Sequence, residues 1–126
     1  EKNVELINPI DSFSRHHKFA GDYGRDKKNI VSIRDHKKTD RVNFFIHIEK
    51  NNGDCTGELK GEAIFTSANT AVYKPPGEPC SLTFKFTSSS VTITEMGCGS
   101  HRGIDCLFDG SFPKKKQSKL KKALKK

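Results

Sequence analysis

Four cysteines are the residues of this 126-residue chain whose type and spacing most clearly allow chemistry. Cys55, Cys80, Cys98 and Cys106 are separated by 25, 18 and 8 residues, and none forms the CxxC pair that is typical of a zinc site. An even set in a short chain favours disulfides and therefore an oxidising compartment. Four cysteines allow three connectivities, and four free thiols in a cytosolic protein are the alternative.

The five histidines, His16, His17, His36, His47 and His101, fall into no recognisable catalytic or metal-binding motif. The chain contains no HExxH, no GxSxG and no P-loop sequence. A small basic nuclease would need two histidines and a lysine converging on a phosphate, and no spacing here selects such a set. We therefore expect no enzymatic activity, no cofactor and no metal ion, with a small basic nuclease using histidine pairs as an alternative.

The segment 95–106, EMGCGSHRGIDC, is the most specific in the chain. It combines three glycines with two cysteines, and a Cys98–Cys106 bridge would close it into a rigid loop. We predict a partner-binding loop at its tip, in which Arg102 offers a bidentate fork to a carboxylate or phosphate. The alternative is a structural hairpin whose tip faces water. The residues of this predicted loop are Gly99, Ser100, His101, Arg102 and Gly103.

The net charge of +8 lies entirely at the C-terminal end of the chain. Residues 1–113 contain 15 basic and 15 acidic residues, whereas residues 114–126 contain eight lysines and no acid. Blocks of like charge stay solvated and often act as interaction tails. The eight lysines predicted to bind an anionic surface are Lys114, Lys115, Lys116, Lys119, Lys121, Lys122, Lys125 and Lys126.

The tail also carries a weak helical pattern, because Leu120, Ala123 and Leu124 are spaced at i, i+3 and i+4. Charge repulsion makes so short a helix marginal in water, so we expect disorder in solution and a helix on an anionic surface. The candidate surfaces are acidic lipid, lipopolysaccharide, sulfated glycan and nucleic acid. A floppy tail that only aids solubility is the alternative.

The body reads as all-β, because short runs of alternating apolar and polar residues are separated by turn sequences at intervals of 8–12 residues. His47 alternates outward on its strand and is expected at the surface. This pattern predicts a small antiparallel barrel of seven or eight strands, a lipocalin-like meander. The predicted strands cover residues 19–23, 29–34, 41–49, 55–65, 70–74, 80–87, 91–95 and 107–112.

Two elements of the form F-x-G-x-aromatic, FAGDY at 19–23 and FDGSF at 108–112, stand at the two ends of the β region. If the first and last strands pair, these elements become neighbours and the barrel closes; coincidence in a chain rich in Phe and Gly is the alternative. In a meander, the strands beginning at Cys55 and Cys80 start at one end of the sheet. On that ground we favour Cys55–Cys80 together with Cys98–Cys106.

The stretch 91–112, VTITEMGCGSHRGIDCLFDGSF, resembles the C-terminal signature of small secreted or periplasmic bacterial proteins labelled lysozyme-inhibitor-like. Residues 55–59 (CTGEL) and 71–73 (AVY) resemble the middle of the same proteins. The resemblance implies an extracytoplasmic β-barrel that binds rather than catalyses. Lysozyme-inhibiting barrels insert a loop with a Ser-Gly-x-x-Tyr-like pattern, which this chain lacks, and cationic lysozymes would repel a chain of charge +8.

Taken together, these features divide the chain into a flexible N-terminal arm (1–18), a β-barrel domain (19–113) and a lysine-rich tail (114–126). The chain begins without Met or a signal peptide, so we expect maturation by cleavage or a chain trimmed to that form. We predict a monomeric, secreted or periplasmic bacterial binding module that engages an anionic polymer or membrane surface, or a protein partner. Inhibition of a lysozyme-type hydrolase through the Cys98–Cys106 loop is the first alternative.

Overall fold

A computed structural model describes residues 8–24, 26–50, 55–99 and 108–115 of the chain. These residues form an eight-stranded antiparallel sheet in which each strand pairs with the next along the chain, as predicted. None of the described residues belongs to a helix that is long and apolar enough to cross a membrane. The strands are β1 (Gly21–Gly24), β2 (Ile30–Asp35), β3 (Arg41–Lys50), β4 (Cys55–Phe65), β5 (Thr70–Tyr73), β6 (Ser81–Phe86), β7 (Ser90–Met96) and β8 (Gly110–Pro113).

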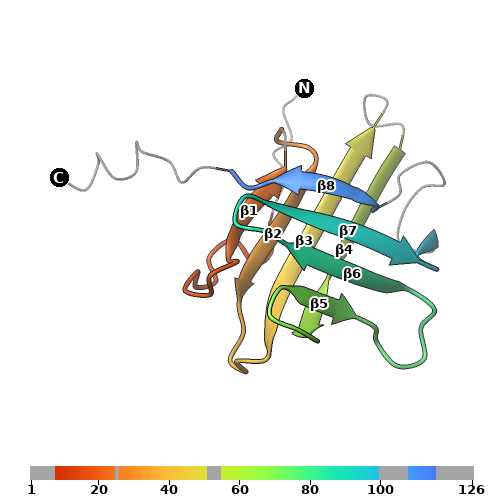
Figure 1. The fold of residues 1–126 in the computed structure, drawn as a ribbon. Coiled ribbons are helices and arrows are strands. Elements are labelled where there is room, and N and C mark those ends of the chain that lie inside the picture. Colours follow the sequence, from red (N-terminus) through yellow and green to blue (C-terminus); the bar gives the residue numbers. More distant parts are fainter. Residues whose placement is uncertain (1–7, 25, 51–54, 100–107, 116–126) are drawn as a thin grey trace.

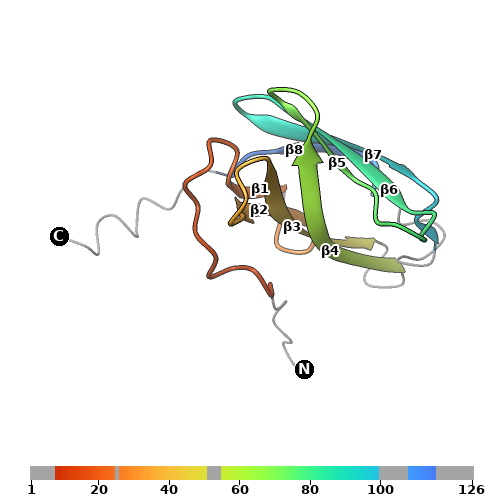
Figure 2. The same cartoon turned by 90° about the horizontal axis from the view of Figure 1, so that it is seen from below.

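The sheet curls into a nearly closed barrel whose two walls cross (Figure 1). Strands β2, β3 and β4 lie steeply in the picture, with β3 pointing up and β2 and β4 pointing down, whereas β6, β7 and β8 run across it (Figure 1). Turned by 90°, the molecule shows β5 to β8 as a layer above β1 to β3 (Figure 2). Because the meander alternates direction, β8 ends at the end of the barrel where β1 and β3 begin and β2 finishes.

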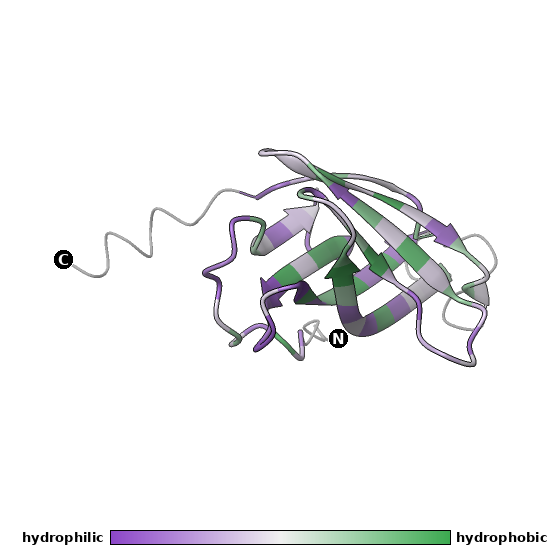
Figure 3. Ribbon diagram, turned by 60° about the horizontal axis from the view of Figure 1, so that its bottom comes forward, coloured by the Kyte–Doolittle hydropathy of each residue, from purple (hydrophilic) through white to green (hydrophobic). Residues whose placement is uncertain are grey.

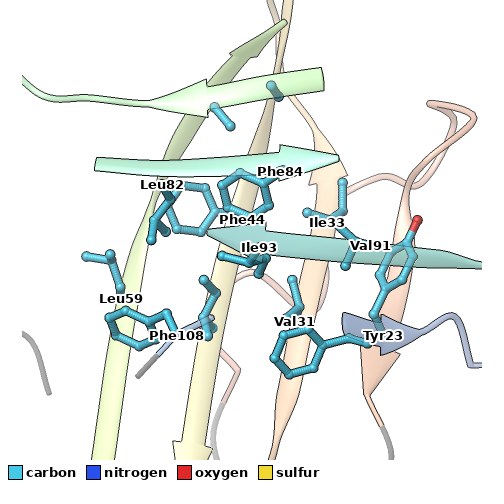
Figure 4. Close-up of a cluster of buried hydrophobic side chains, with 14 of the residues drawn as sticks. Tyr23, Val31, Ile33, Phe44, Leu59, Leu82, Phe84, Val91, Ile93 and Phe108 are labelled. Carbon is cyan, nitrogen blue, oxygen red and sulfur yellow. The ribbon is translucent and has the colours of Figure 1, made fainter. Parts of the chain in front are cut away.

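The barrel interior is filled by side chains. Alternating apolar residues point inward from each strand, which produces the striped colouring of Figure 3. Phe44, Phe84 and Phe86 are fully or almost fully buried, and the rings of Phe44 and Phe84 lie 4.9 Å apart (Figure 4). Gly61 of β4 leaves room for this core, since a Cβ there would lie 2.6 Å from Cε1 of Tyr73.

The two F-x-G-x-aromatic elements have matching conformations. Gly21 and Gly110 both have positive φ angles, of 145° and 153°, and each begins its strand. The aromatic residues before and after each glycine are buried. β1 and the end of β8 meet as predicted, and among the described residues they pair through a bridge between Tyr23 and Lys114, so closure of the barrel is partial. β8 also begins later than predicted, at Gly110, and Leu107 lies outside the described residues.

The predicted cysteine pairing is wrong, because Cys80 is bonded to Cys98. β6 and β7 are neighbours with Ser81 opposite Met96, and this register brings the two cysteines together just beyond the strands. The starts of β4 and β6 do lie at one end of the barrel, but β5 separates the two strands. Cys55 is also disulfide-bonded, and Cys106 lies outside the described residues.

The N-terminal arm is not a flexible appendage over residues 8–18. Ile10 is only 3% exposed, and Asn8 donates from Nδ2 to Oγ of Ser32 on β2 at 2.7 Å. This contact lies on the outer face of the sheet, where Ser32 stands opposite the equally buried Phe45 of β3. The arm therefore adds a second layer outside β2, where it contacts the buried outward residues Ser32 and Arg34. Figure 2 shows the arm, in red and orange, outside the barrel wall.

Candidate functional site

The root of the basic tail is part of the barrel wall. The backbone N–H of Lys114 donates to the carbonyl of Ser89 at 2.7 Å, and that of Lys115 donates to the carbonyl of Asp22 at 2.8 Å. The ammonium group of Lys114 also lies 5.8 Å from the centre of the Tyr23 ring. The first two lysines therefore close the seam between β8 and β1, and the predicted boundary at residue 114 falls inside the fold. Residues 116–126 lie outside the described residues.

Arg34 of β2 ties the arm to the outer face of the barrel. Its side chain is fully buried, and its guanidinium lies 3.1 Å from Oδ1 of Asp11 and 2.9 Å from Oδ1 of Asp22. Nη1 donates to the carbonyls of Gly21 and Ile33, both at 3.1 Å. Burial alone would raise the pKa of Asp22, but the hydrogen bond from Ser32 and the charge of Arg34 hold it below its usual value.

A second attachment of the arm is centred on Asp35, the last residue of β2. Its carboxylate accepts the backbone N–H groups of His16 and His17 at 2.7–2.9 Å, and its own N–H donates to the carbonyl of Ser14. Burial opposes ionisation, but these two N–H groups outweigh it and lower the pKa of Asp35. The arm therefore stands at a fixed position beside the turn between β2 and β3.

An open cleft of about 760 Å³ lies between the arm and this turn. We call it the arm cleft. The arm forms one wall, the turn after β2 forms the second, and outward side chains of β3 and β4 form the floor. Its lining residues are Phe13, Ser14, His16, Asp35, His36, Lys37, Lys38, Arg41, Asn43 and Glu62.

His36 is held in one tautomer within the arm cleft. Its Nδ1 accepts the backbone N–H of Lys38 at 2.9 Å, so Nε2 carries the proton and faces Oε2 of Glu62 at 3.0 Å. Nη1 of Arg41 lies 3.4 Å from Oε1 of the same carboxylate. The hydrogen bond from His36 is the main reason that the pKa of Glu62 is lowered. Because both ring nitrogens of His36 are engaged, this residue is poorly placed to exchange protons with a substrate.

The structure disperses the remaining histidines. His17 stacks on Phe65 at 5.1 Å, and burial lowers the pKa of its ring, which accepts the N–H of Phe19 at Nδ1. The prediction that His47 lies at the surface is wrong, because it is only 7% exposed. Its Nδ1 lies 2.7 Å from Oε2 of Glu58 on β4, and its Nε2 lies 3.0 Å from Oε2 of Glu49 on its own strand. His101 lies outside the described residues.

Only the base of the predicted partner-binding loop is described. Gly97 has φ +68° and lies so close to the carbonyl of Pro79 that a Cβ would be 2.5 Å from it. The carboxylate of Glu95 accepts the N–H of Phe108 at 2.7 Å, which braces the returning strand. Of the predicted loop, Gly99 is described, whereas 100–103 lie outside the described residues.

Comparison of the chain with protein-family models, with curated proteins and with solved structures gave no match. The resemblance to lysozyme-inhibitor-like proteins therefore stays a prediction. Among the described residues, no group of three or more His, Cys, Asp or Glu side chains is arranged to hold a metal ion.

The arm cleft was not foreseen from the sequence. Its lining comes from three separate segments, and only a docked arm brings Phe13 next to residues of β3 and β4. One signal was available, because the run Arg34, Asp35, His36, Lys37, Lys38 concentrates charge at the end of a predicted strand. Without the arm in place, that run looks like an ordinary solvated turn.

Proposed function

We propose that this protein is an exported, non-enzymatic binding module that attaches to anionic surfaces through its C-terminal lysines. The observation that carries the proposal is the charge distribution: a body of 15 basic and 15 acidic residues followed by a segment with eight lysines and no acid. A neutral body removes long-range repulsion from the surface, whereas the tail supplies attraction. The Cys80–Cys98 disulfide is consistent with an oxidising compartment.

The attachment of the first two tail lysines to the barrel also supports the proposal. Lys114 and Lys115 are held by hydrogen bonds to Ser89 and Asp22, so a tail bound to a surface would hold the barrel through a fixed joint. Nζ of Lys114 reaches the carbonyl of Lys18, before β1, at 3.4 Å, and Nζ of Lys115 reaches the carbonyl of Asp26, after β1, at 3.0 Å, so the root of the tail lies along the β1 edge of the barrel. Binding through the tail would therefore bring the β1 edge of the barrel towards the surface.

The experiment compares two variants of equal charge. The tail-neutral variant replaces by glutamine the six lysines that follow the anchored root: Lys116, Lys119, Lys121, Lys122, Lys125 and Lys126. The body-neutral variant replaces six exposed lysines of the barrel by glutamine: Lys27, Lys28, Lys50, Lys60, Lys74 and Lys85. Both retain Lys114 and Lys115 and both have a formal charge of +2, since six positive charges are removed from +8.

Retention is measured on anionic vesicles, neutral vesicles and a heparin column at low salt. Each lysine near an anionic membrane contributes about 1 kcal/mol, so the tail-neutral variant should bind up to about 10⁴-fold more weakly. The body-neutral variant should retain most of the binding. Equal losses in the two variants would show that net charge alone matters, and undiminished binding of the tail-neutral variant would reject the proposal.

A second candidate function, inhibition of a lysozyme-type hydrolase through the predicted loop, has one supporting observation. The described base of that loop is rigid, because Cys98 is bonded to Cys80 and the position of Gly97 admits no side chain. A mixing assay against lysozymes tests it directly: attachment through the tail predicts unchanged lysozyme turnover, whereas loop insertion predicts inhibition that Arg102→Ala relieves.

A further inference from the structure

We propose that the arm cleft binds an acidic saccharide, by which we mean a short sugar chain with carboxylate or sulfate groups. The cleft has about 760 Å³, which lies within the range of small-molecule sites in proteins. Its walls are fixed before any ligand arrives, because the carboxylate of Asp35 binds the backbone of His16 and His17 while Ser14 accepts the N–H of Asp35. A preformed wall reduces the entropy that binding would otherwise cost.

The charged side chains of the cleft that have no ion-pair partner among the described residues are positive. The carboxylate of Asp35 is occupied by two backbone N–H groups, and that of Glu62 faces His36 and Arg41. Lys37 and Lys38, in contrast, are exposed and form no ion pair with any residue of the described part of the chain. A ligand that enters the cleft therefore meets ammonium groups that are available and acids that are already paired, so an anionic group on the ligand is favoured.

The rest of the lining is suited to hydroxyl groups and to an apolar ring face. Phe13 is 42% exposed and lines the cleft, where its ring offers a platform for the C–H face of a pyranose. Asn43 donates from Nδ2 to the carbonyl of Asp35 at 2.8 Å, which fixes the amide. Its Oδ1 accepts no hydrogen bond from the described residues and is therefore available to a ligand hydroxyl.

The mixture of acceptors and donors decides between a saccharide and a polyphosphate. Phosphate oxygens mainly accept hydrogen bonds at neutral pH, so a polyphosphate offers few donors to the remaining lone pairs of the Asp35 and Glu62 carboxylates. A saccharide brings hydroxyl donors for those oxygens and needs only one or two anionic groups for Lys37 and Lys38. Phe13 is the one apolar side chain among the lining residues, whereas a lipid chain would require several.

The test uses the full chain, labelled with ¹⁵N, and four probes: digalacturonate, neutral galactobiose, inorganic triphosphate and anionic phospholipid vesicles. We expect digalacturonate to shift the backbone resonances of Phe13, His36 and Lys38, and to bind at least about tenfold more tightly than galactobiose. Phe13→Ala and the double variant Lys37→Gln/Lys38→Gln should each weaken binding about tenfold. The matched control, Lys27→Gln/Lys28→Gln, changes two exposed lysines at the opposite end of the barrel and should leave binding unchanged.

The outcomes separate this proposal from that for the tail. The tail-neutral variant should bind digalacturonate as the wild type does, even though its retention on vesicles falls. Equal losses in the Lys37/Lys38 and Lys27/Lys28 double variants would overturn the cleft proposal, as would triphosphate binding more tightly than digalacturonate or resonance shifts confined to residues outside the cleft. Cleft shifts caused by vesicles alone would assign the site to lipid instead.

Discussion

Removing the guanidinium of Arg34 should unfasten the arm and destabilise the barrel strongly. The side chain is fully buried, so Arg34→Ala would leave the carbonyls of Gly21 and Ile33 without their donor and the carboxylate of Asp22 without its counter-charge. Each lost hydrogen bond to a neutral carbonyl costs about 1 kcal/mol, and the bond to a charged partner about 1.5–3 kcal/mol. The sum is roughly 3–5 kcal/mol.

The matched control is Arg41→Ala. Arg41 also pairs with two carboxylates, those of Asp40 and Glu62, but its own side chain is 20% exposed, whereas that of Arg34 is fully buried. Such a pair contributes about 0–1 kcal/mol. Urea unfolding followed by far-UV circular dichroism gives both free energies of unfolding. Arg34→Ala should also expose residues 8–18 to limited proteolysis under native conditions. Losses of similar size in the two variants, or an arm that stays protected in Arg34→Ala, would refute the reasoning.

Three further predictions concern the barrel. Gly61→Ala should cost about 1–3 kcal/mol, since its Cβ would lie 2.6 Å from the Tyr73 ring, whereas Gly99→Ala, with nothing within 4 Å, should be neutral in the same urea titration. The double variant Cys80→Ser/Cys98→Ser should lower the free energy of unfolding by about 3 kcal/mol, because it opens a loop with a sequence separation of 18, and an unchanged thermal midpoint would contradict this. Burial lowers the pKa of His17 below its usual 6.5, so between the two pKa values the unfolded chain binds more protons than the folded chain. The free energy of unfolding is therefore unaffected by His17 above about pH 6.5 and falls as the pH drops towards the folded pKa. His17→Asn should reduce the difference between the urea midpoints at pH 7.5 and pH 5.5, and an undiminished difference would assign it to other groups.

The strands were predictable because each one buries a single face inside the barrel. In β3, Val42, Phe44 and Ile46 recur with period two, and the turn sequences on either side limit the strand to within about a residue. The pairing of consecutive strands was predictable because short turns join each strand to the next. The F-x-G-x-aromatic repeat correctly brought the first and last strands together.

The sequence did not reveal that the N-terminal arm forms a second layer outside the barrel wall. Period two shows that a strand has two faces, but it does not show that an arm packs against the outer one, so the burial of Ser32 and Arg34 was not foreseen. His47 was predicted at the surface and is buried, with its ring nitrogens facing Glu49 and Glu58. The prediction of the cysteine pairing was wrong for a separate reason. The argument placed Cys55 and Cys80 at one barrel end, yet adjacency of β6 and β7 decides the partner of Cys80.

The salt dependence of polyanion binding tests the central claim, that attachment resides in the tail, most directly. Binding to heparin is measured across a range of salt concentrations for the wild type, the tail-neutral variant and the body-neutral variant. With about 0.7 counterions released per lysine, as for a single-stranded polyanion, the slope of log affinity against log salt should be shallower by about 4 in the tail-neutral variant. The body-neutral variant should keep the wild-type slope to within about 1. Equal slopes for the wild type and the tail-neutral variant, or a fall confined to the body-neutral variant, would contradict the account.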